Sequence, residues 1–387
     1  MENKTEVTEN KNREKKIALM HDFLLYYGGA EATLKSISEI FSQGDYQNEI
    51  FTILKKEKTA KEIFPGKKVK TSFLQKWPNF IKRRHKLMAP FMPVAVETFD
   101  FRDYDLIISS SSAFAKGVVV KPKTTHVCYM HAPMRYVWDW HHEYIEENKL
   151  KGNIKFFTRL LLNYLRMWDR ASADRVDYFI ANSKYTQKRI KKYYRKDSKV
   201  IYPPVDISKF TPQKENMGYF LAVGRLSPYK GMKLLVDVFD KLKLPLVIVG
   251  DGEERKELEK MVEGNKHIRI MGWVDDEKLA KLYENARAFV SVSLDDFQIT
   301  TVEAMAAGKP AVVLKKGGTA ETVIEGVTGE FFDVAQLEIV ADGIRRFIEK
   351  DEKGVYDYRK IRERAEEFSK ERFEREMKEF VEGVNNE

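Results

Sequence analysis

The sequence predicts an α/β fold built from two halves, each with a mostly parallel sheet. Short apolar runs with the length of buried strands alternate with stretches of helical periodicity along most of the chain. A chain of 387 residues is long for one domain and comfortable for two. Strands that alternate with helices indicate parallel sheets with helices packed on their faces.

The first half opens with an apolar run at 17–23, followed by a loop that contains Gly28 and Gly29. Helical periodicity follows, so this unit has the shape of a phosphate-facing loop at a helix start. It lacks G-x-G-x-x-G, which argues against a dinucleotide site. Further strands are predicted in the first half at 105–109, 125–129 and 178–182.

The two prolines in residues 202–206 indicate a stiff linker, which places the crossing into the second half there. The charged stretch from Tyr358 to Val384 predicts one final helix. The tail at 1–15 is polar and predicted to be disordered. The expected domains are therefore 16–205 and 206–365. Strands in the second half are predicted at 219–223, 246–252, 269–274, 288–292 and 311–314.

Two loops in the second half carry opposite charges. Gly224, Arg225 and Lys230 follow the run at 219–223, and residues 295–303, with Asp295 first and Glu303 last, follow the run at 288–292. Ligands of open α/β sheets bind at the carboxyl ends of strands. Two cations suit a diphosphate, and carboxylates suit sugar and ribose hydroxyls. Together the loops predict a nucleotide-sugar pocket.

These segments resemble the donor site of the retaining GT-B glycosyltransferases of family 4, also called glycosyltransferase group 1. The acidic signature of that family ends in Glu303 and matches Asp296, Phe297 and Ile299, but has Glu, Gly and Pro where this chain has Asp295, Gln298 and Thr301. The resemblance implies two Rossmann-like domains that face each other across a cleft. It also implies that 317–321 meets phosphate through backbone amides. In this family the last helix, 366–387 here, returns to the N-terminal domain.

Segments 27–31, 109–117 and 131–139 resemble the mannosyltransferase-like branch of the family, which makes surface polysaccharides and O-antigen lipopolysaccharide. Ser112 departs from the histidine expected there. The resemblance assigns His131 to the transferred sugar near the reacting centre. The expected catalytic residues are His131, Asp295, Arg225 and Lys230. Donor-binding residues are expected at Gly28, Gly29, Gly224, Arg225, Lys230, Asp296, Phe297, Gln298, Ile299 and Glu303, and acceptor-binding residues at Arg135 and Tyr136.

No metal or other cofactor is expected. Asp295 and Asp296 do not form the D-x-D arrangement of metal-dependent glycosyltransferases, and the histidines match no ligand spacing. Two fixed cations, Arg225 and Lys230, can neutralise a diphosphate leaving group without an ion.

The expected function is retaining transfer of a hexose, with mannose from GDP-mannose favoured, to a glycan or a lipid-linked glycan in surface polysaccharide synthesis. Two alternatives remain open. One is a degenerate sugar-nucleotide-binding protein, given the departures at 112, 295, 298 and 301. The other is a sugar-nucleotide epimerase of the non-Rossmann type on the same fold. Only turnover distinguishes the first alternative from an active transferase.

The net charge of +9 calls for an anionic partner. The basic cluster at 82–86, with Trp77 and Phe80 before it and Met88 after it, fits an anionic membrane surface. A second cluster at 155–166 has helical spacing and is interpreted as a helix with an apolar core face and snorkelling cations, with membrane docking as the less favoured alternative. Nucleic acid is not expected, because no known binding module accompanies the charge. A single cysteine and the absence of a signal peptide or apolar span predict a cytoplasmic protein, with the inner face of the plasma membrane as a second expected place.

Overall fold

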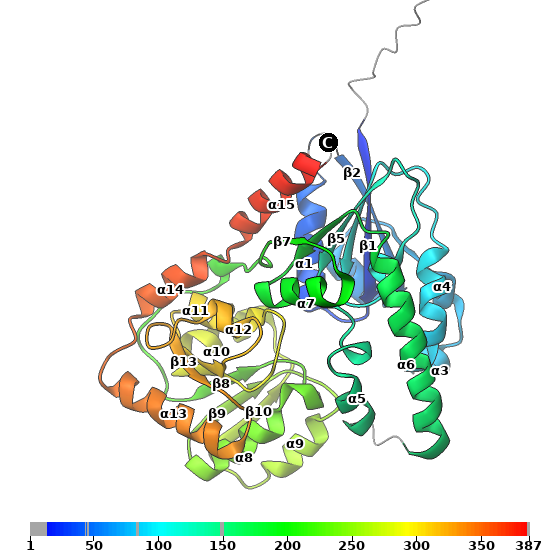
Figure 1. Ribbon diagram of the computed structural model, residues 1–387. Helices are drawn as coiled ribbons and strands as arrows, with labels where there is room; N and C mark the ends of the chain where they lie inside the picture. Colours follow the sequence, from blue (N-terminus) through cyan, green and yellow to red (C-terminus); the bar gives the residue numbers. More distant parts are fainter. Residues whose placement is uncertain (1–13, 43, 45, 83–84, 148–150, 385–387) are drawn as a thin grey trace, which may run out of the picture.

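In the computed structural model the chain forms two α/β domains, which Figure 1 shows side by side. The structure describes residues 14–42, 44, 46–82, 85–147 and 151–384. Most of the predicted disordered tail lies outside these residues, and Lys15 already begins the first strand. The predicted arrangement of two Rossmann-like domains is confirmed.

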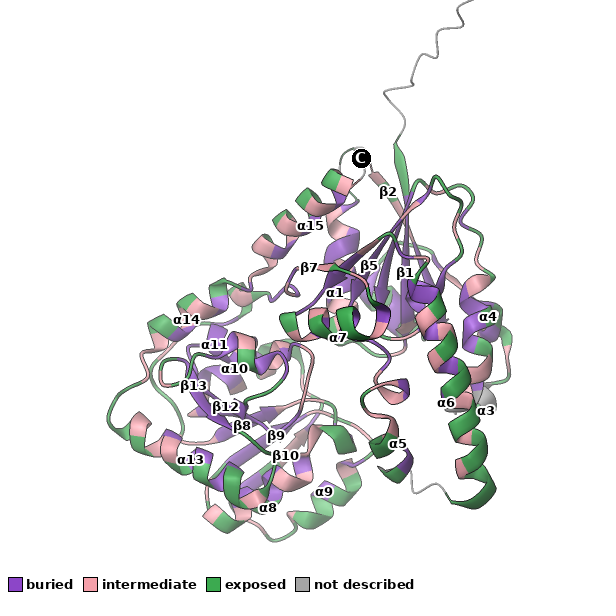
Figure 2. Ribbon diagram, in the orientation of Figure 1, coloured by how far each residue is buried: buried purple, intermediate pink, exposed green. Residues whose placement is uncertain are grey.

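The N-terminal sheet has seven parallel strands in the order β3-β2-β1-β4-β5-β6-β7. The strands are β1 (Lys15–Leu24), β2 (Tyr46–Lys55), β3 (Val69–Thr71), β4 (Leu106–Ser111), β5 (Thr125–Met130), β6 (Tyr178–Ala181) and β7 (Ser198–Val200). The α-helices around them are α1 (Gly29–Ile40), α2 (Glu57–Ile63), α3 (Asn79–Lys82), α4 (Met92–Glu97), α5 (His141–Glu147), α6 (Gly152–Ala173) and α7 (Lys184–Tyr194). Figure 2 shows the strands buried and the helices exposed on their outer faces.

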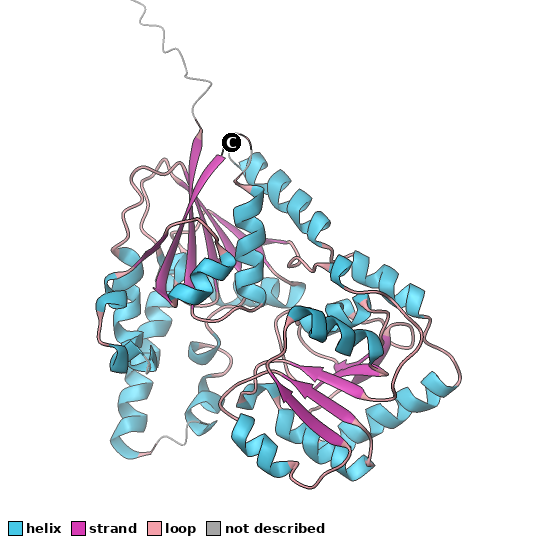
Figure 3. Ribbon diagram, turned by 180° about the vertical axis from the view of Figure 1, so that it is seen from behind, coloured by secondary structure: helices cyan, strands magenta, loops and turns pink. Residues whose placement is uncertain are grey.

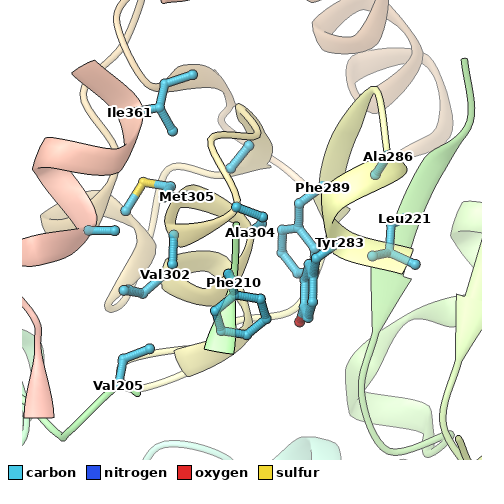
Figure 4. Close-up of a cluster of buried hydrophobic side chains, with 14 of the residues drawn as sticks. Val205, Phe210, Leu221, Tyr283, Ala286, Phe289, Val302, Ala304, Met305 and Ile361 are labelled. Carbon is cyan, nitrogen blue, oxygen red and sulfur yellow. The ribbon is translucent and has the colours of Figure 1, made fainter. Parts of the chain in front are cut away.

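The C-terminal sheet has six parallel strands in the order β10-β9-β8-β11-β12-β13, seen from behind in Figure 3. The strands are β8 (Phe220–Val223), β9 (Leu246–Val249), β10 (Ile268–Gly272), β11 (Ala288–Ser291), β12 (Ala311–Leu314) and β13 (Gly329–Phe332). The α-helices are α8 (Met232–Leu242), α9 (Arg255–Met261), α10 (Asp276–Asn285), α11 (Ile299–Ala306), α12 (Thr319–Thr322) and α13 (Leu337–Glu352). Figure 4 shows Phe289 and Tyr283 packed beside Leu221 in one core of this domain.

Both sheets reverse their strand order at their centre, between β1 and β4 in one and between β8 and β11 in the other. Ligands of such sheets bind where the order reverses, at the carboxyl ends of the strands. The cationic loop follows β8 and the acidic loop follows β11, so the topology brings the two charged loops to one point.

The chain crosses between the domains twice, and the two crossings lie side by side. Val205 donates its backbone N–H to the carbonyl of Phe368 (3.1 Å), and the N–H of Lys370 returns to Val205 (3.0 Å). This contact interrupts the predicted final helix, which is two helices, α14 (Tyr358–Glu366) and α15 (Lys370–Val384). The expectation of one helix was wrong because the backbone at 368–370 bonds to the linker instead of continuing the helix.

Helix α15 packs on the N-terminal domain along α1, as Figure 1 shows. Phe373, Met377 and Val381 are fully buried in the same cluster as Leu34 and Ile37. The end of the chain therefore ties the two domains together through apolar burial. Within the described residues, no helix combines the length and apolarity that crossing a bilayer needs.

Candidate functional site

The loop after β8 is shaped by glycines that the sequence analysis did not single out. A Cβ on Gly250 would lie 1.9 Å from the carbonyl oxygen of Gly224, and one on Gly252 would lie 2.2 Å from that of Leu226. Only glycine therefore lets the loop after β9 lie directly against the backbone of the cationic loop. This contact holds the backbone that carries Arg225.

The predicted cation Lys230 and the predicted carboxylate Asp295 form a buried ion pair. The Lys230 ammonium lies 2.7 Å from Oδ2 of Asp295, and each side chain is less than a fifth exposed. Burial alone would lower the pKa of Lys230, but the attraction of Asp295 outweighs it and raises the pKa. Burial would likewise raise the pKa of Asp295, but Lys230 and a hydrogen bond from Ser293 lower it. Both groups are therefore ionised at neutral pH.

Arg225 is exposed. Its guanidinium lies 5.3 Å from the centre of the Tyr26 ring, which belongs to the N-terminal domain. This distance is within the range of a cation–π contact. Arg225 thus faces the opposite domain, whereas Lys230 is turned toward the acidic loop.

Gln298 adopts the left-handed conformation (φ 65°) that usually requires glycine, which is the residue expected there from the resemblance. Its buried Nε2 amide lies within hydrogen-bond distance of Ser291 (2.5 Å), Ser293 (3.0 Å) and Oδ2 of Asp295 (3.2 Å). The Thr301 hydroxyl, at the position expected to be proline, donates to the side-chain oxygen of Gln298 (2.9 Å). Two of the three departures are therefore bonded to each other, and the third, Asp295, lies against them.

His131 follows β5 and shares a hydroxyl group with a second histidine. Nε2 of His131 lies 2.8 Å from Ser110 Oγ, and Nδ1 of His21 lies 3.1 Å from the same oxygen. A hydroxyl can donate only one hydrogen, so at least one of the two imidazoles donates to it. Burial, together with His21, lowers the pKa of His131 to about 3, so the ring is neutral at physiological pH.

Asp296, predicted to bind the donor, is held by two arginines from the N-terminal domain. The Arg189 guanidinium lies 2.5 Å from Oδ1, and Nε of Arg135 lies 3.5 Å from Oδ2. Burial would lower the pKa of Arg189, but Asp296 and Asp139 raise it. Arg135, predicted to bind the acceptor, also donates to the carbonyl of Leu294 (2.6 Å). The sequence analysis missed Arg189, because one arginine in a basic helix carries no periodic signal.

Thr186 brings His131 and the acidic loop together. Its hydroxyl lies 3.4 Å from the carbonyl oxygen of His131 and 3.4 Å from Oδ1 of Asp296. The structure therefore places predicted residues of the two halves on either side of one threonine.

Glu321, in the loop predicted to meet phosphate, caps a helix of the opposite domain. Its carboxylate accepts the backbone N–H groups of Lys184 (2.8 Å) and Tyr185 (2.7 Å), the first residues of α7, and the hydroxyl of Tyr202 (3.1 Å). A carboxylate at a helix N-terminus satisfies unpaired N–H groups and interacts favourably with the helix dipole. This contact was also missed, since it joins residues 136 positions apart.

The remaining predicted residues lie around this centre. Glu303 accepts a hydrogen bond from Tyr283 (2.8 Å), and burial raises the pKa of its carboxyl. A Cβ on Gly29 would lie 2.7 Å from Cδ1 of Ile299, so these residues face each other across the domain boundary. Phe297 is 3% exposed and packs in the core, so only its backbone can reach a ligand.

The two other predicted residues lie on the N-terminal side. Burial raises the pKa of Tyr136, whose ring centre lies 5.8 Å from that of Tyr144. The backbone of Gly28 accepts the N–H of Ala32 (2.9 Å) at the start of α1. Among the described residues, no group of three or more His, Cys, Asp or Glu side chains is arranged to hold a metal ion.

We expect Gln298→Gly and Thr301→Val to show non-additive effects on the free energy of unfolding, because the two side chains share a buried hydrogen bond. A coupling of about 1 kcal/mol is expected from urea denaturation of both single variants and the double variant. Thr301→Val with Tyr356→Phe is the matched control, since Tyr356 bonds to Glu330 instead and shares no partner with Thr301. Additive effects of the first pair would contradict the coupling.

The protein should lose stability as the pH falls below about 6.5. Burial lowers the pKa of His126 to about 4 and that of His131 to about 3, so the folded state resists a proton that the unfolded state accepts. The contribution of each histidine to the free energy of unfolding is fully present above the pKa of the unfolded state. Below that pKa it declines, and at pH 5.5 it is lower by about 1.4 kcal/mol per histidine. Urea denaturation at pH 7.5 and 5.5 measures it. His131→Asn should reduce the difference, and an unchanged difference would contradict the assignment.

Glu321→Ala should loosen domain closure, because the N–H groups of Lys184 and Tyr185 lose their carboxylate partner from the other domain, although Ser183 still caps α7. Loss of a capping contact costs about 0.5–2 kcal/mol. Small-angle scattering of the ligand-free protein should then give a larger radius of gyration than the unmodified chain. Glu325→Ala, which removes an exposed ion pair with Lys315 within one domain, is the control and should leave the radius unchanged.

Two family models match successive parts of the chain. "Glycosyltransferase Family 4" matches residues 27–209, and "Glycosyl transferases group 1" matches residues 206–371. D-rhamnosyltransferase WbpZ of Pseudomonas aeruginosa is 29% identical over 206 residues, which are 49% of this chain and 52% of that protein. A GDP-mannose-dependent alpha-mannosyltransferase of Corynebacterium glutamicum is 33% identical over 117 residues, 30% and 28% of the two chains.

The chain thus spans about half or less of the length of the curated relatives it matches. Among solved structures, HepE of Anabaena, determined with UDP and glucose, superposes with a TM-score of 0.69 at 19% identity. That superposition covers 95% of this chain and 100% of the other, and it shows the fold. With the two family models covering adjoining halves of the chain, the protein belongs to the family 4, group 1 glycosyltransferases.

Proposed function

We propose that this protein transfers a hexose from a nucleotide-diphosphate sugar to a glycan or lipid-linked glycan, with retention of the anomeric configuration. The observation that carries the proposal is the Lys230–Asp295 pair, which lies in the donor domain where the strand order reverses. Mannose from GDP-mannose is the favoured donor, supported by the mannosyltransferase-like motifs of the first half and by the similarity to a GDP-mannose-dependent enzyme.

Each side chain has a role that its surroundings permit. Arg225 and Lys230 supply positive charge for the departing diphosphate, and charge stabilisation of this kind is strongest in a site from which water is excluded. Asp295 is ionised and can accept a hydrogen bond from a sugar hydroxyl. Oδ2 of Asp295 is already within hydrogen-bond distance of Lys230, Ser293 and Gln298. In this scheme Oδ1 therefore accepts the hydrogen bond from the sugar hydroxyl.

His131 acts as a neutral hydrogen-bonding group. Its pKa of about 3 makes an imidazolium unfavourable, so the ring positions the sugar without contributing a full charge. The acceptor hydroxyl then attacks on the face that the diphosphate leaves, and a phosphate oxygen takes its proton. The protein provides positioning and electrostatics. Two fixed cations make a metal unnecessary in this scheme.

The test is turnover. Incubation with a panel of nucleotide-sugars and candidate acceptors, with and without EDTA, should release a nucleotide diphosphate, most rapidly from GDP-mannose. Activity restored only by added magnesium or manganese would overturn metal independence. Nucleotide binding without release from any donor would favour the degenerate sugar-nucleotide binder, and isomerisation of the donor would favour the epimerase.

Arg225→Ala or Lys230→Ala should weaken the binding of nucleotide diphosphates, because each removes a charge-assisted contact. The expected loss is about 1.5–3 kcal/mol, or roughly ten- to a hundredfold in affinity by calorimetry. Lys241→Ala is the control, since Lys241 pairs with Glu338 away from the charged loops. Unchanged affinity in both site variants would remove the two cations from the donor site.

A further inference from the structure

The membrane-docking prediction for the basic cluster at 82–86 stays a prediction, although two of the apolar side chains assigned to it pack in or against the core. Met88 is fully buried in the N-terminal core, and Trp77 packs on Phe91 with ring centres 5.1 Å apart. Both residues were expected to insert into a membrane. For Met88 this expectation was wrong because the core buries it completely, whereas Trp77 is half-buried against the same core. The side chains of residues 83–87 lie outside the described part of the structure, and only Phe80 is described as strongly exposed (71%).

Helix α6 instead has two apolar faces. Leu162 and Leu165 point into the core on one side. The opposite side exposes large apolar side chains that recur at helical spacing: Phe156, Phe157, Leu160, Tyr164 and Met167, each between 42% and 66% exposed. In Figure 1 the N-terminal part of α6 extends away from the sheet, and Figure 2 shows it largely exposed. The sequence analysis favoured the core-face interpretation of this helix over membrane docking.

The charged residues of α6 that come before Asp169 are all basic. From Lys151 to Trp168 there is no acidic residue, whereas Lys155, Arg159 and Arg166 lie in this stretch. The first acidic residue, Asp169, is fully buried and paired with Lys116. Cations beside an exposed apolar stripe complement an anionic lipid surface. A second copy of the chain would bring the same cations against each other.

The same helix supports the loop that carries His131 and Arg135. Nε of Arg166 donates to the carbonyl of Val137 (2.5 Å), and the Trp138 indole donates to Asp169 (2.7 Å). The helix that carries the exposed stripe therefore also makes the contacts that position the predicted acceptor loop.

We propose that the exposed face of α6, formed by Phe156, Phe157, Leu160, Tyr164 and Met167 with its flanking cations, docks on an anionic membrane. Docking there brings a lipid-linked acceptor to the loop of Arg135. The delivery of a lipid-linked acceptor rests on the proposed transferase function, whereas the membrane docking does not.

The test is flotation of the full chain with phosphatidylcholine vesicles and with vesicles that also contain phosphatidylglycerol. The unmodified chain should bind the anionic vesicles only, and binding should weaken as salt screens the charges. A triple variant, Phe157→Ser, Leu160→Ser and Tyr164→Ser, should lose at least tenfold in partitioning. Lys155→Gln with Arg159→Gln should lose about fivefold per cation.

The matched controls change equally exposed groups of the other domain. Met217→Ser with Val334→Ser and Val355→Ser replaces three exposed apolar side chains, and Lys256→Gln with Lys260→Gln removes two exposed cations. Both controls should bind vesicles as the unmodified chain does. Thermal unfolding of each variant verifies that it is folded.

Equal flotation of the triple variant and the unmodified chain would overturn the proposal, as would failure of the unmodified chain to bind anionic vesicles. A dimer in light scattering that the triple variant converts to monomer would overturn it in favour of self-association. Vesicle binding without turnover of any nucleotide-sugar would leave docking standing and remove the transferase function, so the two failures are distinguishable.

Discussion

The loop after β11 carries two adjacent carboxylates. One binds a cation of the same domain, and the other binds cations of the opposite domain. Asp295 pairs with Lys230 of its own domain, and Asp296 pairs with Arg189 and Arg135 of the other. The loop that shapes the predicted donor site thus also links the two domains through ion pairs. A phosphate that draws Lys230 away from Asp295 acts on this same short segment, so ligand binding and domain closure share one structural element.

These ion pairs are better evidence for geometry than for stability. Burying two charges costs desolvation that their attraction roughly repays, whereas removing one partner leaves an uncompensated charge. Arg189 illustrates the consequence, because its guanidinium is held between Asp296 and Asp139 and has little freedom. Arg225 contrasts with it, since an exposed guanidinium keeps its charge available for a ligand.

The sequence predicted the architecture well because buried parallel strands leave a direct signal in apolar runs. The strands at 17–23, 219–223 and 288–292 were found, and with them the loops that carry Arg225 and Asp295. Contacts between the domains left no such signal. The pairing of Glu321 with α7 and the break before Lys370 both depend on which segments meet in space. Membrane docking of α6 was not favoured for a related reason, since periodicity shows that a face is apolar but not whether a core covers it.

The replacements at 298 and 301 bear on whether the donor site is in use. A site without a function gathers substitutions that leave buried polar groups unpaired, and each such group costs about 1–3 kcal/mol. Here the Gln298 amide has its oxygen and its nitrogen satisfied, by Thr301 on one side and by the serines and Asp295 on the other. Gln298 also adopts a left-handed backbone conformation, which costs energy for any residue other than glycine. Gln298 and Thr301 compensate each other, and Gln298 also contacts Oδ2 of Asp295, which favours a reshaped site over a degenerate one.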